Sequence, residues 1–264
     1  MNLDGCVALI TGASAGLGRE FAIQLASKAR ILVLVARRAD RLAKLRNEIT
    51  AQRPEVRVQI RAVDLSSSTE VSDLTNWLGQ QNLEPDFLVN NAGLGDLGPF
   101  HTAAPDRLDQ VIRVNVLSLT LLTRALLPPM IARNRGAILN VSSSAGFLPI
   151  PGFAVYAATK AFVTSFSEGL RSELRTHCIT VSALCPGPIH TEFTAVAYRP
   201  GAQPQSAPEF VHVSPQRVVR AGLRAIERNQ ALVIPGLVIK TAMFFTRITP
   251  MPLLRLAGRL RRVE

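Results

Sequence analysis

Short apolar runs alternate along the chain with longer segments in which apolar residues recur every three or four positions. Most of the short runs are continuous, which is typical of strands that helices cover on both faces. The longer segments have the period of amphipathic helices. The pattern predicts strands at residues 6–10, 31–36, 56–63, 87–90, 137–141, 179–184 and 231–234. It predicts helices at residues 17–27, 40–51, 68–78, 105–132, 155–176 and 215–228.

Alternating strands and helices indicate βαβ units and therefore a parallel sheet. The expected fold is an α/β, doubly wound parallel sheet of about seven strands with helices on both faces. A chain of 264 residues can form this fold as one domain, and residues 1–264 show no internal repeat or linker. Two segments depart from the pattern, a loop at 187–213 and an apolar, basic C-terminal extension at 237–264. Loops as long as 187–213 are commonly functional, and this one is expected to border the substrate.

A glycine-rich turn follows the first expected strand, with the sequence TGASAGLG at residues 11–18. Gly12, Gly16 and Gly18 allow a tight turn from strand to helix and a close approach of the backbone to a pyrophosphate. The N-terminus of the helix that follows favours negative charge. Within an alternating α/β chain, this turn predicts a dinucleotide site.

Tyr156 and Lys160 are four residues apart in an expected helix, so both project from one face. An ammonium group beside a phenol favours the phenolate, so Lys160 is expected to lower the pKa of Tyr156 from its reference value of about 10. Tyr156 is then a candidate general acid or base. Ser143 lies thirteen residues earlier and is a candidate to hold a substrate oxygen. Together with the dinucleotide site, these residues predict hydride transfer to or from a carbonyl or an alcohol.

Four motifs stand in order along the chain: the turn at 11–18, Asn-Asn-Ala-Gly at 90–93, the set of Ser143, Tyr156 and Lys160, and Pro-Gly-Pro-Ile-His-Thr at 186–191. In this order and spacing the chain resembles the short-chain dehydrogenase/reductase superfamily, in the branch with a single domain of about this size. The resemblance covers residues 6 to about 191. It implies a Rossmann-like fold and an oxidoreductase that uses a nicotinamide cofactor.

The resemblance also implies roles for single residues. The implied catalytic residues are Ser143, Tyr156, Lys160 and Asn115, with Asn115 holding a water in a proton relay with the lysine. No metal site is implied, and His190 is expected to be a spacer. The implied cofactor contacts are Gly12, Ser14, Gly16, Leu17, Gly18, Asp64, Leu65, Asn91, Ala92, Gly93, Tyr156, Lys160, Pro186, Gly187, Ile189 and Thr191.

The end of the second strand bears on the choice between NAD and NADP. NAD-binding folds carry a carboxylate there, which accepts a hydrogen bond from the ribose 2′-hydroxyl. This chain has Ala36 followed by Arg37 and Arg38, and arginine suits a 2′-phosphate. Ser14 is expected to donate another bond, so NADP(H) is favoured over NAD(H). Two points weigh against this: Ala15 stands where many NADP-binding relatives have a basic residue, and a solvated helix start explains Arg38 equally well.

The stretch 144–155, between Ser143 and Tyr156, contains no charged residue. Because this stretch borders the substrate in the family, the expected substrate is a lipophilic ketone or aldehyde rather than a small acid. The alternative function is a catalytically silent NADP-binding scaffold or sensor at a membrane surface. The intact catalytic residues favour the enzyme, since a silent module has no need of them all.

The net charge of +11 is compatible with a nucleic-acid partner, but no reader motif accompanies it, so none is expected. Three isolated cysteines suit a reducing cytosol. The chain shows neither a secretory signal nor a run of about eighteen uninterrupted apolar residues. The expected location is therefore cytoplasmic, with membrane association as an alternative.

The C-terminal extension combines apolar residues with arginines such as Arg255 and Arg259, a pattern that is compatible with an interfacial helix. It is equally compatible with a helix packed on a second subunit or on the substrate pocket. In relatives the helix that carries the tyrosine and lysine packs across a two-fold axis, so a homodimer or homotetramer is expected. The apolar residues expected at that contact are Phe162, Val163, Phe166 and Leu170.

Overall fold

The computed structural model describes residues 1–199, 208–250 and 252. In this part of the chain, one sheet of seven parallel strands has the order β3-β2-β1-β4-β5-β6-β7, which confirms the expected doubly wound fold. Each strand lies within one residue of its predicted position. The strands are β1 (Val7–Thr11), β2 (Ile31–Ala36), β3 (Arg57–Ala62), β4 (Phe87–Asn90), β5 (Gly136–Val141), β6 (Ile179–Leu184) and β7 (Leu232–Val233).

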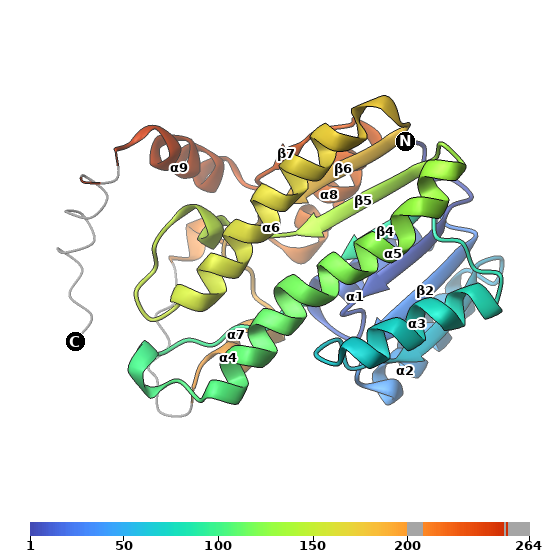
Figure 1. Cartoon of the computed structure of the whole chain (residues 1–264), viewed down its shortest axis with the longest axis horizontal. Coiled ribbons are helices and arrows are strands. Elements are labelled where there is room, and N and C mark those ends of the chain that lie inside the picture. The colour runs from blue at the N-terminus through green and yellow to red at the C-terminus, as the bar shows by residue number, and fades with distance from the viewer. Residues whose placement is uncertain (200–207, 251, 253–264) are drawn as a thin grey trace.

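Helices cover both faces of the sheet (Figure 1). One face carries α1 (Gly16–Leu25), α2 (Ala39–Gln52) and α8 (Pro215–Glu227). The other face carries α3 (Ser68–Gln80), α5 (Ser118–Ala132) and α6 (Ala154–Glu173). Among the described residues, α7 (Glu192–Ala197) lies outside these layers in the loop after β6, and α9 (Leu237–Ile248) lies outside them after β7.

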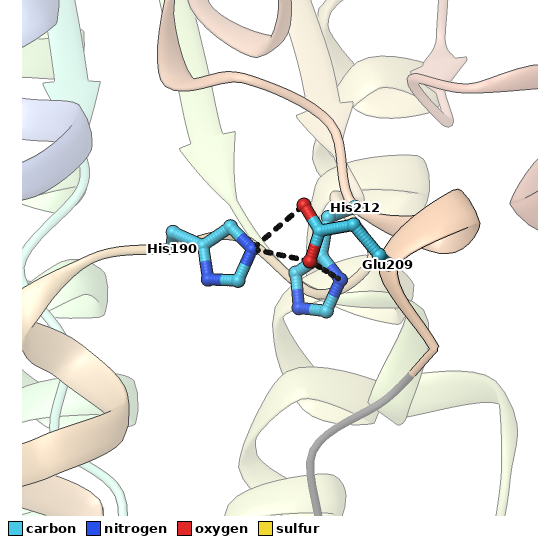
Figure 2. Close-up of side chains that lie close together, drawn as sticks. All are labelled: His190, Glu209 and His212. Atoms are coloured by element: carbon cyan, nitrogen blue, oxygen red, sulfur yellow. Dashed lines mark hydrogen bonds and ion pairs between the residues drawn. The ribbon is translucent and has the colours of Figure 1, made fainter.

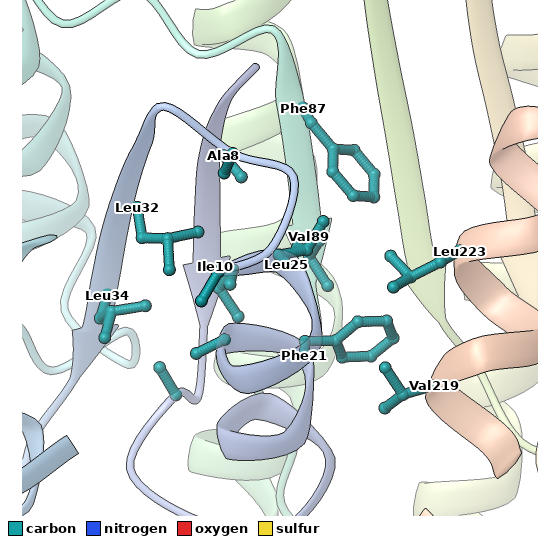
Figure 3. Close-up of a cluster of buried hydrophobic side chains, with 14 of the residues drawn as sticks. Ala8, Ile10, Phe21, Leu25, Leu32, Leu34, Phe87, Val89, Val219 and Leu223 are labelled. Atoms are coloured by element: carbon teal, nitrogen blue, oxygen red, sulfur yellow. The ribbon is translucent and has the colours of Figure 1, made fainter. Parts of the chain in front are cut away.

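Two apolar layers hold the helices to the sheet, because successive residues of a strand point to opposite faces. Ile10 of β1 belongs to the layer under α1, whereas Leu9 belongs to the layer under α3 and α5. Figure 3 shows the first layer, in which Phe21 of α1 lies beside Val219 and Leu223 of α8. Phe21 is fully buried, and the burial of one such side chain contributes about 1.5–3 kcal/mol to folding.

The helix predicted at 105–132 is interrupted by a π-helical turn. It begins as α4 (Pro105–Ile112), passes through the π turn Arg113–Leu117 and continues as α5. Turns of this kind are rare and are frequent at functional sites. Asn115 lies within the turn, so an irregularity of the helix positions this side chain.

The same helix, Pro105–Ala132, is long and apolar enough to cross a membrane by length and composition alone. Its parts pack against α3 and α6, and 44% of its most apolar window is buried inside the protein. Because the core helices of soluble proteins meet the same criterion, this composition is weak evidence for a membrane span.

The strand order reverses between β1 and β4. In open α/β sheets, ligands bind beyond the carboxyl ends of the strands at such a point. The glycine turn follows β1 there and contacts the segment after β4, where the backbone amides of Asn91 and Ala92 both donate to Thr11 Oγ1 at 3.0 Å. The segments after β5 and β6 meet at the same edge, where Ser144 N donates to Pro186 O at 2.8 Å. The fold therefore brings the four sequence motifs to one edge of the sheet.

Candidate active site

The glycine turn has a conformation and a packing that require glycine. Gly12 and Gly16 have φ angles of +67° and +52°, in the left-handed region. A Cβ on Gly12 would lie 2.9 Å from Cα of Ala92, and a Cβ on Gly18 would lie 2.2 Å from the carbonyl oxygen of Gly12. A Cβ on Gly16 would face Thr191 at 3.5 Å, so the turn and the loop after β6 approach each other here. This narrow backbone cradle at the start of α1 fits a dinucleotide pyrophosphate.

Arginine side chains gather beside the glycine turn, next to the end of β2. Arg38 donates from Nε and Nη2 to Ser14 Oγ at 3.3 and 3.2 Å. Arg38 and Arg41 both bind the carboxylate of Glu192, at 3.1 and 2.7 Å. The strand itself ends at Ala36 and offers no carboxylate for a ribose 2′-hydroxyl. This donor set suits a phosphate better than a hydroxyl.

Arg37, which the sequence analysis predicted as a ligand of the 2′-phosphate together with Arg38, acts on Asp64 in the structure. Asp64 Oδ1 accepts hydrogen bonds from N and Oγ of Ser66 at 2.9 and 2.8 Å. Burial acts to raise the pKa of Asp64, but these bonds and the charge of Arg37 outweigh it and hold the pKa below its ordinary value. Asp64 thus shapes the turn after β3, and Leu65 beside it is buried. The contact of these two residues with an adenine stays a prediction.

Tyr156 and Lys160 lie on one face of α6, and both side chains are buried. Ser143, which follows β5, lies close enough to the Tyr156 hydroxyl to lower its pKa. Lys160 Nζ lies 5.7 Å from the centroid of the Tyr156 ring and donates to Val141 O at 2.8 Å. The three residues that the sequence singled out are therefore neighbours in space.

The pKa values of this group differ from the sequence-based expectation. Burial raises the pKa of Tyr156 to about 12, and the nearby Ser143 opposes this only in part. Burial also lowers the pKa of Lys160 to about 8. The expectation that Lys160 lowers the pKa of Tyr156 is wrong for this structure, because Nζ is directed to Val141 O and burial disfavours both charged forms. Tyr156 is a phenol that retains its proton at neutral pH, which suits a general acid.

The amide of Asn115 is occupied by the loop after β4. Its Oδ1 accepts from Leu94 N at 2.8 Å, and its Nδ2 donates to Leu94 O at 2.9 Å and to Thr159 Oγ1 at 3.0 Å. A Cβ on Gly93 would lie 3.4 Å from Lys160 Nζ and 3.5 Å from Asn115 Oδ1, so this glycine borders both side chains. Asn115 therefore positions the loop beside the lysine, and its role in holding a water stays a prediction.

The loop at 186–191 is fixed by contacts on both of its sides. A Cβ on Gly187 would lie 2.8 Å from Ile239 of α9, so this glycine allows α9 to approach. Ile189 packs partly buried against the core under α1. Thr191 Oγ1 accepts from Phe193 N at 3.4 Å and caps α7, which leaves the hydroxyl proton of Thr191 free to donate. This geometry is compatible with the expected contact of Thr191 with the cofactor.

Aromatic side chains surround the ring of Tyr156. Phe153 stacks on it with centroids 4.2 Å apart, and Phe193 of α7 lies at 5.4 Å with its plane tilted by 46°. A Cβ on Gly95 would lie within 3.3 Å of the side chains of Ala197, Phe193 and Phe153. The phenol of Tyr156 therefore faces an apolar wall. No sequence signal connects Phe153 with Phe193, because they are far apart along the chain and meet only through the fold.

The C-terminal helix α9 packs against this region on one side. Met243 is buried, and the guanidinium of Arg247 lies 5.7 Å from the Phe147 ring centroid in the short segment after β5. The opposite side exposes Leu237, Val238, Phe244, Phe245 and Ile248. The described part of the extension thus borders the substrate side and has an exposed apolar face. The rest of the extension, with Arg255 and Arg259, lies outside the described residues.

The outer face of α6 differs in part from the expected contact set. Val163 and Leu170 are buried within the protein, because they point toward the sheet. Phe162 is exposed and stacks on Phe166 with ring centroids 5.8 Å apart. The apolar surface available on α6 is therefore formed by the two phenylalanines, and the inclusion of Val163 and Leu170 was wrong.

A histidine and glutamate cluster joins the two ends of the long loop (Figure 2). Glu209 Oε2 lies 3.1 Å from His190 Nε2, and the rings of His190 and His212 stack with centroids 4.0 Å apart. Their ligand atoms lie within 4.8 Å of one another, a spacing that a metal ion could use. The rings are nearly parallel, at 7°, so their lone pairs do not converge and the imidazoles would have to turn first. His190 is more than a spacer, since it ties the loop after β6 to the segment before α8.

Comparisons with known proteins agree with this geometry. The sequence matches the short chain dehydrogenase family over residues 6–200. It is 32% identical over 226 residues to the very-long-chain 3-oxoacyl-CoA reductase of Anas platyrhynchos, a match that covers 84% of this chain and 69% of that protein.

Two solved structures are similar to this one. A short-chain dehydrogenase from Sphingobium yanoikuyae in complex with NADPH shares 30% identity at a TM-score of 0.79, covering 93% of this chain and 97% of its own. A short-chain dehydrogenase/reductase from Burkholderia phymatum in complex with NAD shares 25% identity at a TM-score of 0.81, covering 92% and 93%. The fold and these matches identify an oxidoreductase that transfers hydride between a nicotinamide cofactor and a CH–OH or C=O group. The chain therefore belongs to the short-chain dehydrogenase/reductase family.

Proposed function

We propose that this protein is an NADP(H)-dependent oxidoreductase whose substrate is a lipophilic ketone or aldehyde, or the corresponding alcohol. The observation that carries the proposal is the buried phenol of Tyr156, near Ser143 and Lys160, at the sheet edge that also holds the glycine turn. Bound NADPH supplies the hydride, and the protein positions and polarises the substrate.

Each catalytic side chain has a distinct task in the reductive direction. Ser143 and Tyr156 together hold the carbonyl oxygen of the substrate. Tyr156, with a pKa of about 12, keeps its proton until an alkoxide develops and then donates it, because an alkoxide is more basic than a phenolate. Lys160, with a pKa of about 8, is able to return a proton near neutral pH. Asn115 holds the neighbouring loop and, in the proposal, the water through which this proton travels.

The preference for NADP(H) rests on the side chains beside the glycine turn. Arg38, Ser14 and Arg41 form a cationic, hydrogen-bonding group where the adenosine ribose binds in this fold. The similar structure in complex with NADPH supports the preference, whereas the similar structure in complex with NAD shows that relatives with either cofactor exist. Arg38 therefore replaces Arg37 as the leading ligand of the 2′-phosphate in the proposal.

Fluorescence titration with NADPH and NADH tests this preference. The unmodified protein is expected to bind NADPH more tightly, since each charge-assisted hydrogen bond contributes about 1.5–3 kcal/mol. Arg38→Ala should reduce NADPH affinity and leave NADH affinity nearly unchanged, while Arg53→Ala, at an exposed position at the end of α2, should change neither. Equal affinities for the two cofactors in the unmodified protein would contradict the proposal.

The lipophilic substrate rests on the apolar wall around Tyr156 formed by Phe153, Phe193 and the inner side of α9. The name of the reductase from Anas platyrhynchos, a very-long-chain 3-oxoacyl-CoA reductase, points to the same chemical class. Steady-state NADPH oxidation should be measured across carbonyl compounds of increasing apolar size. A rising kcat/KM with apolar size is expected, and turnover restricted to small charged oxoacids would refute the assignment. Tight NADPH binding without turnover of any carbonyl would favour the silent scaffold instead.

Assembly and location complete the proposal. The exposed Phe162, stacked on Phe166, provides an apolar contact for a homodimer or homotetramer, to be checked by light scattering at micromolar concentration.

The helix α9 has an exposed apolar face and also contains Lys240 and Arg247. This combination suits a cytoplasmic enzyme that contacts an anionic membrane surface. Co-sedimentation with anionic vesicles at low salt tests this contact. Binding that persists unchanged after Phe244→Ser and Phe245→Ser would contradict it.

A further inference from the structure

Glu192, the first residue of α7, connects two parts of the site. Its carboxylate accepts hydrogen bonds from Arg38 Nη1 at 3.1 Å and from Arg41 Nη1 at 2.7 and 2.8 Å. Arg38 at the same time binds Ser14 Oγ in the glycine turn. A carboxylate held by two guanidinium groups beside a hydroxyl places negative charge and acceptor oxygens where a phosphate would also place them. Glu192 thus occupies the arginine pair as a phosphate analogue.

The residues after Glu192 reach the catalytic group. Phe193 directly follows Glu192, and the centroid of its ring lies 5.4 Å from the centroid of the Tyr156 ring. At its other end α7 is fixed to the loop after β4, where Leu97 N donates to Ala197 O at 2.7 Å. The helix therefore links the arginine pair to the apolar wall around the phenol.

We propose that Glu192 is an internal competitor of the cofactor 2′-phosphate, and that NADP(H) releases α7 from the arginine pair when it binds. This inference rests on the proposed NADP(H) preference. A phosphate monoester carries a charge of about −1.5 to −2, so it attracts Arg38 and Arg41 more strongly than a single carboxylate does. The Glu192 carboxylate and the 2′-phosphate cannot both bind Arg38 and Arg41 closely, because the two negative charges repel each other. A cofactor without a 2′-phosphate leaves Glu192 in place.

The size of the competition follows from the exposure of the ion pairs. The Glu192 side chain is 52% exposed, and its arginine partners are about as exposed, so solvent weakens both pairs. Together, two exposed ion pairs of this kind should change the dissociation constant of NADPH by about three- to tenfold. Glu192→Gln retains the size of the side chain and removes its charge. This variant is therefore expected to bind NADPH about three- to tenfold more tightly.

Cofactor titrations form the first test, with fluorescence of NADPH and NADH as the readout. The three proteins are the unmodified chain, Glu192→Gln and Glu209→Gln. Glu209 is a matched control, because it is an exposed carboxylate of the same loop that pairs with His190 and not with the arginines. We expect tighter NADPH binding for Glu192→Gln alone, and NADH affinities that agree within about twofold among the three proteins.

Hydrogen exchange of the α7 amides forms the second test and does not depend on turnover. The probes are 2′,5′-ADP, which carries the 2′-phosphate, and 5′-AMP, which lacks it. In the unmodified protein, 2′,5′-ADP should increase exchange across residues 193–197, and 5′-AMP should not, because only the first displaces Glu192. In Glu192→Gln these amides should exchange faster from the start and respond to neither probe.

The outcomes separate this inference from the proposed function. Equal affinity of the unmodified protein for NADPH and NADH would overturn both. A clear preference for NADPH that Glu192→Gln leaves unchanged would overturn the role of Glu192 alone. Equal gains for Glu192→Gln and Glu209→Gln would also overturn it, because any loss of negative charge would then have the same effect. Exchange in α7 that responds equally to both probes would exclude the release of the helix.

Discussion

Replacing Lys160 by methionine removes a buried charge while nearly keeping the volume of the side chain. Lys160 is 4% exposed, and burial lowers its pKa from 10.5 to about 8. A lowered pKa means that the folded protein binds this proton less tightly than the unfolded chain does. Lys160 therefore destabilises the folded state at neutral pH, and its removal should stabilise the protein there.

The magnitude follows from the two pKa values. Each tenfold difference in proton affinity corresponds to about 1.4 kcal/mol, so a change from 10.5 to about 8 amounts to about 3 kcal/mol. Below pH 8 both states carry the proton, and the folded state bears this full cost. Between pH 8 and pH 10.5 only the unfolded chain still binds the proton, so the cost falls as the pH rises.

A second term opposes the gain. Lys160 Nζ donates to Val141 O at 2.8 Å, and a methionine leaves that carbonyl without this donor, at a cost of about 1–3 kcal/mol at every pH. The Lys160→Met variant should therefore be as stable as the unmodified protein or up to about 2 kcal/mol more stable at pH 7. At pH 10 and above it should be less stable. The difference between the two proteins should change by about 2–3 kcal/mol over this range.

Urea unfolding followed by circular dichroism measures this difference at pH 7, 8, 9 and 10, at one protein concentration. Lys44→Met is the control, since Lys44 is an exposed lysine of α2, and its difference from the unmodified protein should stay nearly constant with pH. A constant stability difference for Lys160→Met across the range would refute the argument from burial. If Lys160→Met instead lost stability relative to the unmodified protein as the pH falls, the effect of burial on the charged lysine would have the opposite sign to the one predicted.

Three further predictions concern the same site. Tyr156→Phe should lower kcat by about 10²–10⁴-fold and preserve NADPH binding in a fluorescence titration, because only the proton donor is removed; retention of more than about a tenth of kcat would exclude the acid role. Asn115→Ala breaks the bonds to the loop after β4 and should lower the free energy of unfolding by about 1–3 kcal/mol in urea, and an unchanged value would show that the loop holds itself. Gly18→Ala should abolish NADPH binding, since its Cβ would lie 2.2 Å from Gly12 O, whereas Gly79→Ala, with no atom near its Cβ, should bind NADPH normally.

Strand positions could be predicted from the sequence because each strand has a local signature. The continuous apolar run at Ile31–Ala36 became β2 with the predicted bounds, since both of its faces lie under helices. The grouping of the motifs was predictable for a related reason. Residues that follow parallel strands lie at one edge of the sheet, so the motifs after β1, β4, β5 and β6 must converge once the strand order is established.

Several features of the helices could not be predicted from local patterns. The π turn at Arg113–Leu117 spans only five residues inside a long helical pattern, so the period of the whole segment does not reveal it. Val163 and Leu170 were expected on the outer face of α6 but are buried, because an apolar residue fits a core and a subunit contact equally well by composition. The short helix α7 lies in a segment whose composition is typical of a loop, and its contacts with the loop after β4 hold it in place.

Which chemical groups this protein possesses, and which of them share a helix face, follows from the sequence alone. Ser143, Tyr156 and Lys160 belong to this class, because a four-residue spacing in a helix and an ordered set of motifs are local properties. The environment of these groups depends on how the chain folds. The pKa of Tyr156 rises rather than falls because it depends on burial by Phe153 and Phe193, and Arg38 meets Ser14 and Glu192 through three separate loops. Burial and contacts between distant segments arise when the chain folds, so no local pattern carries them.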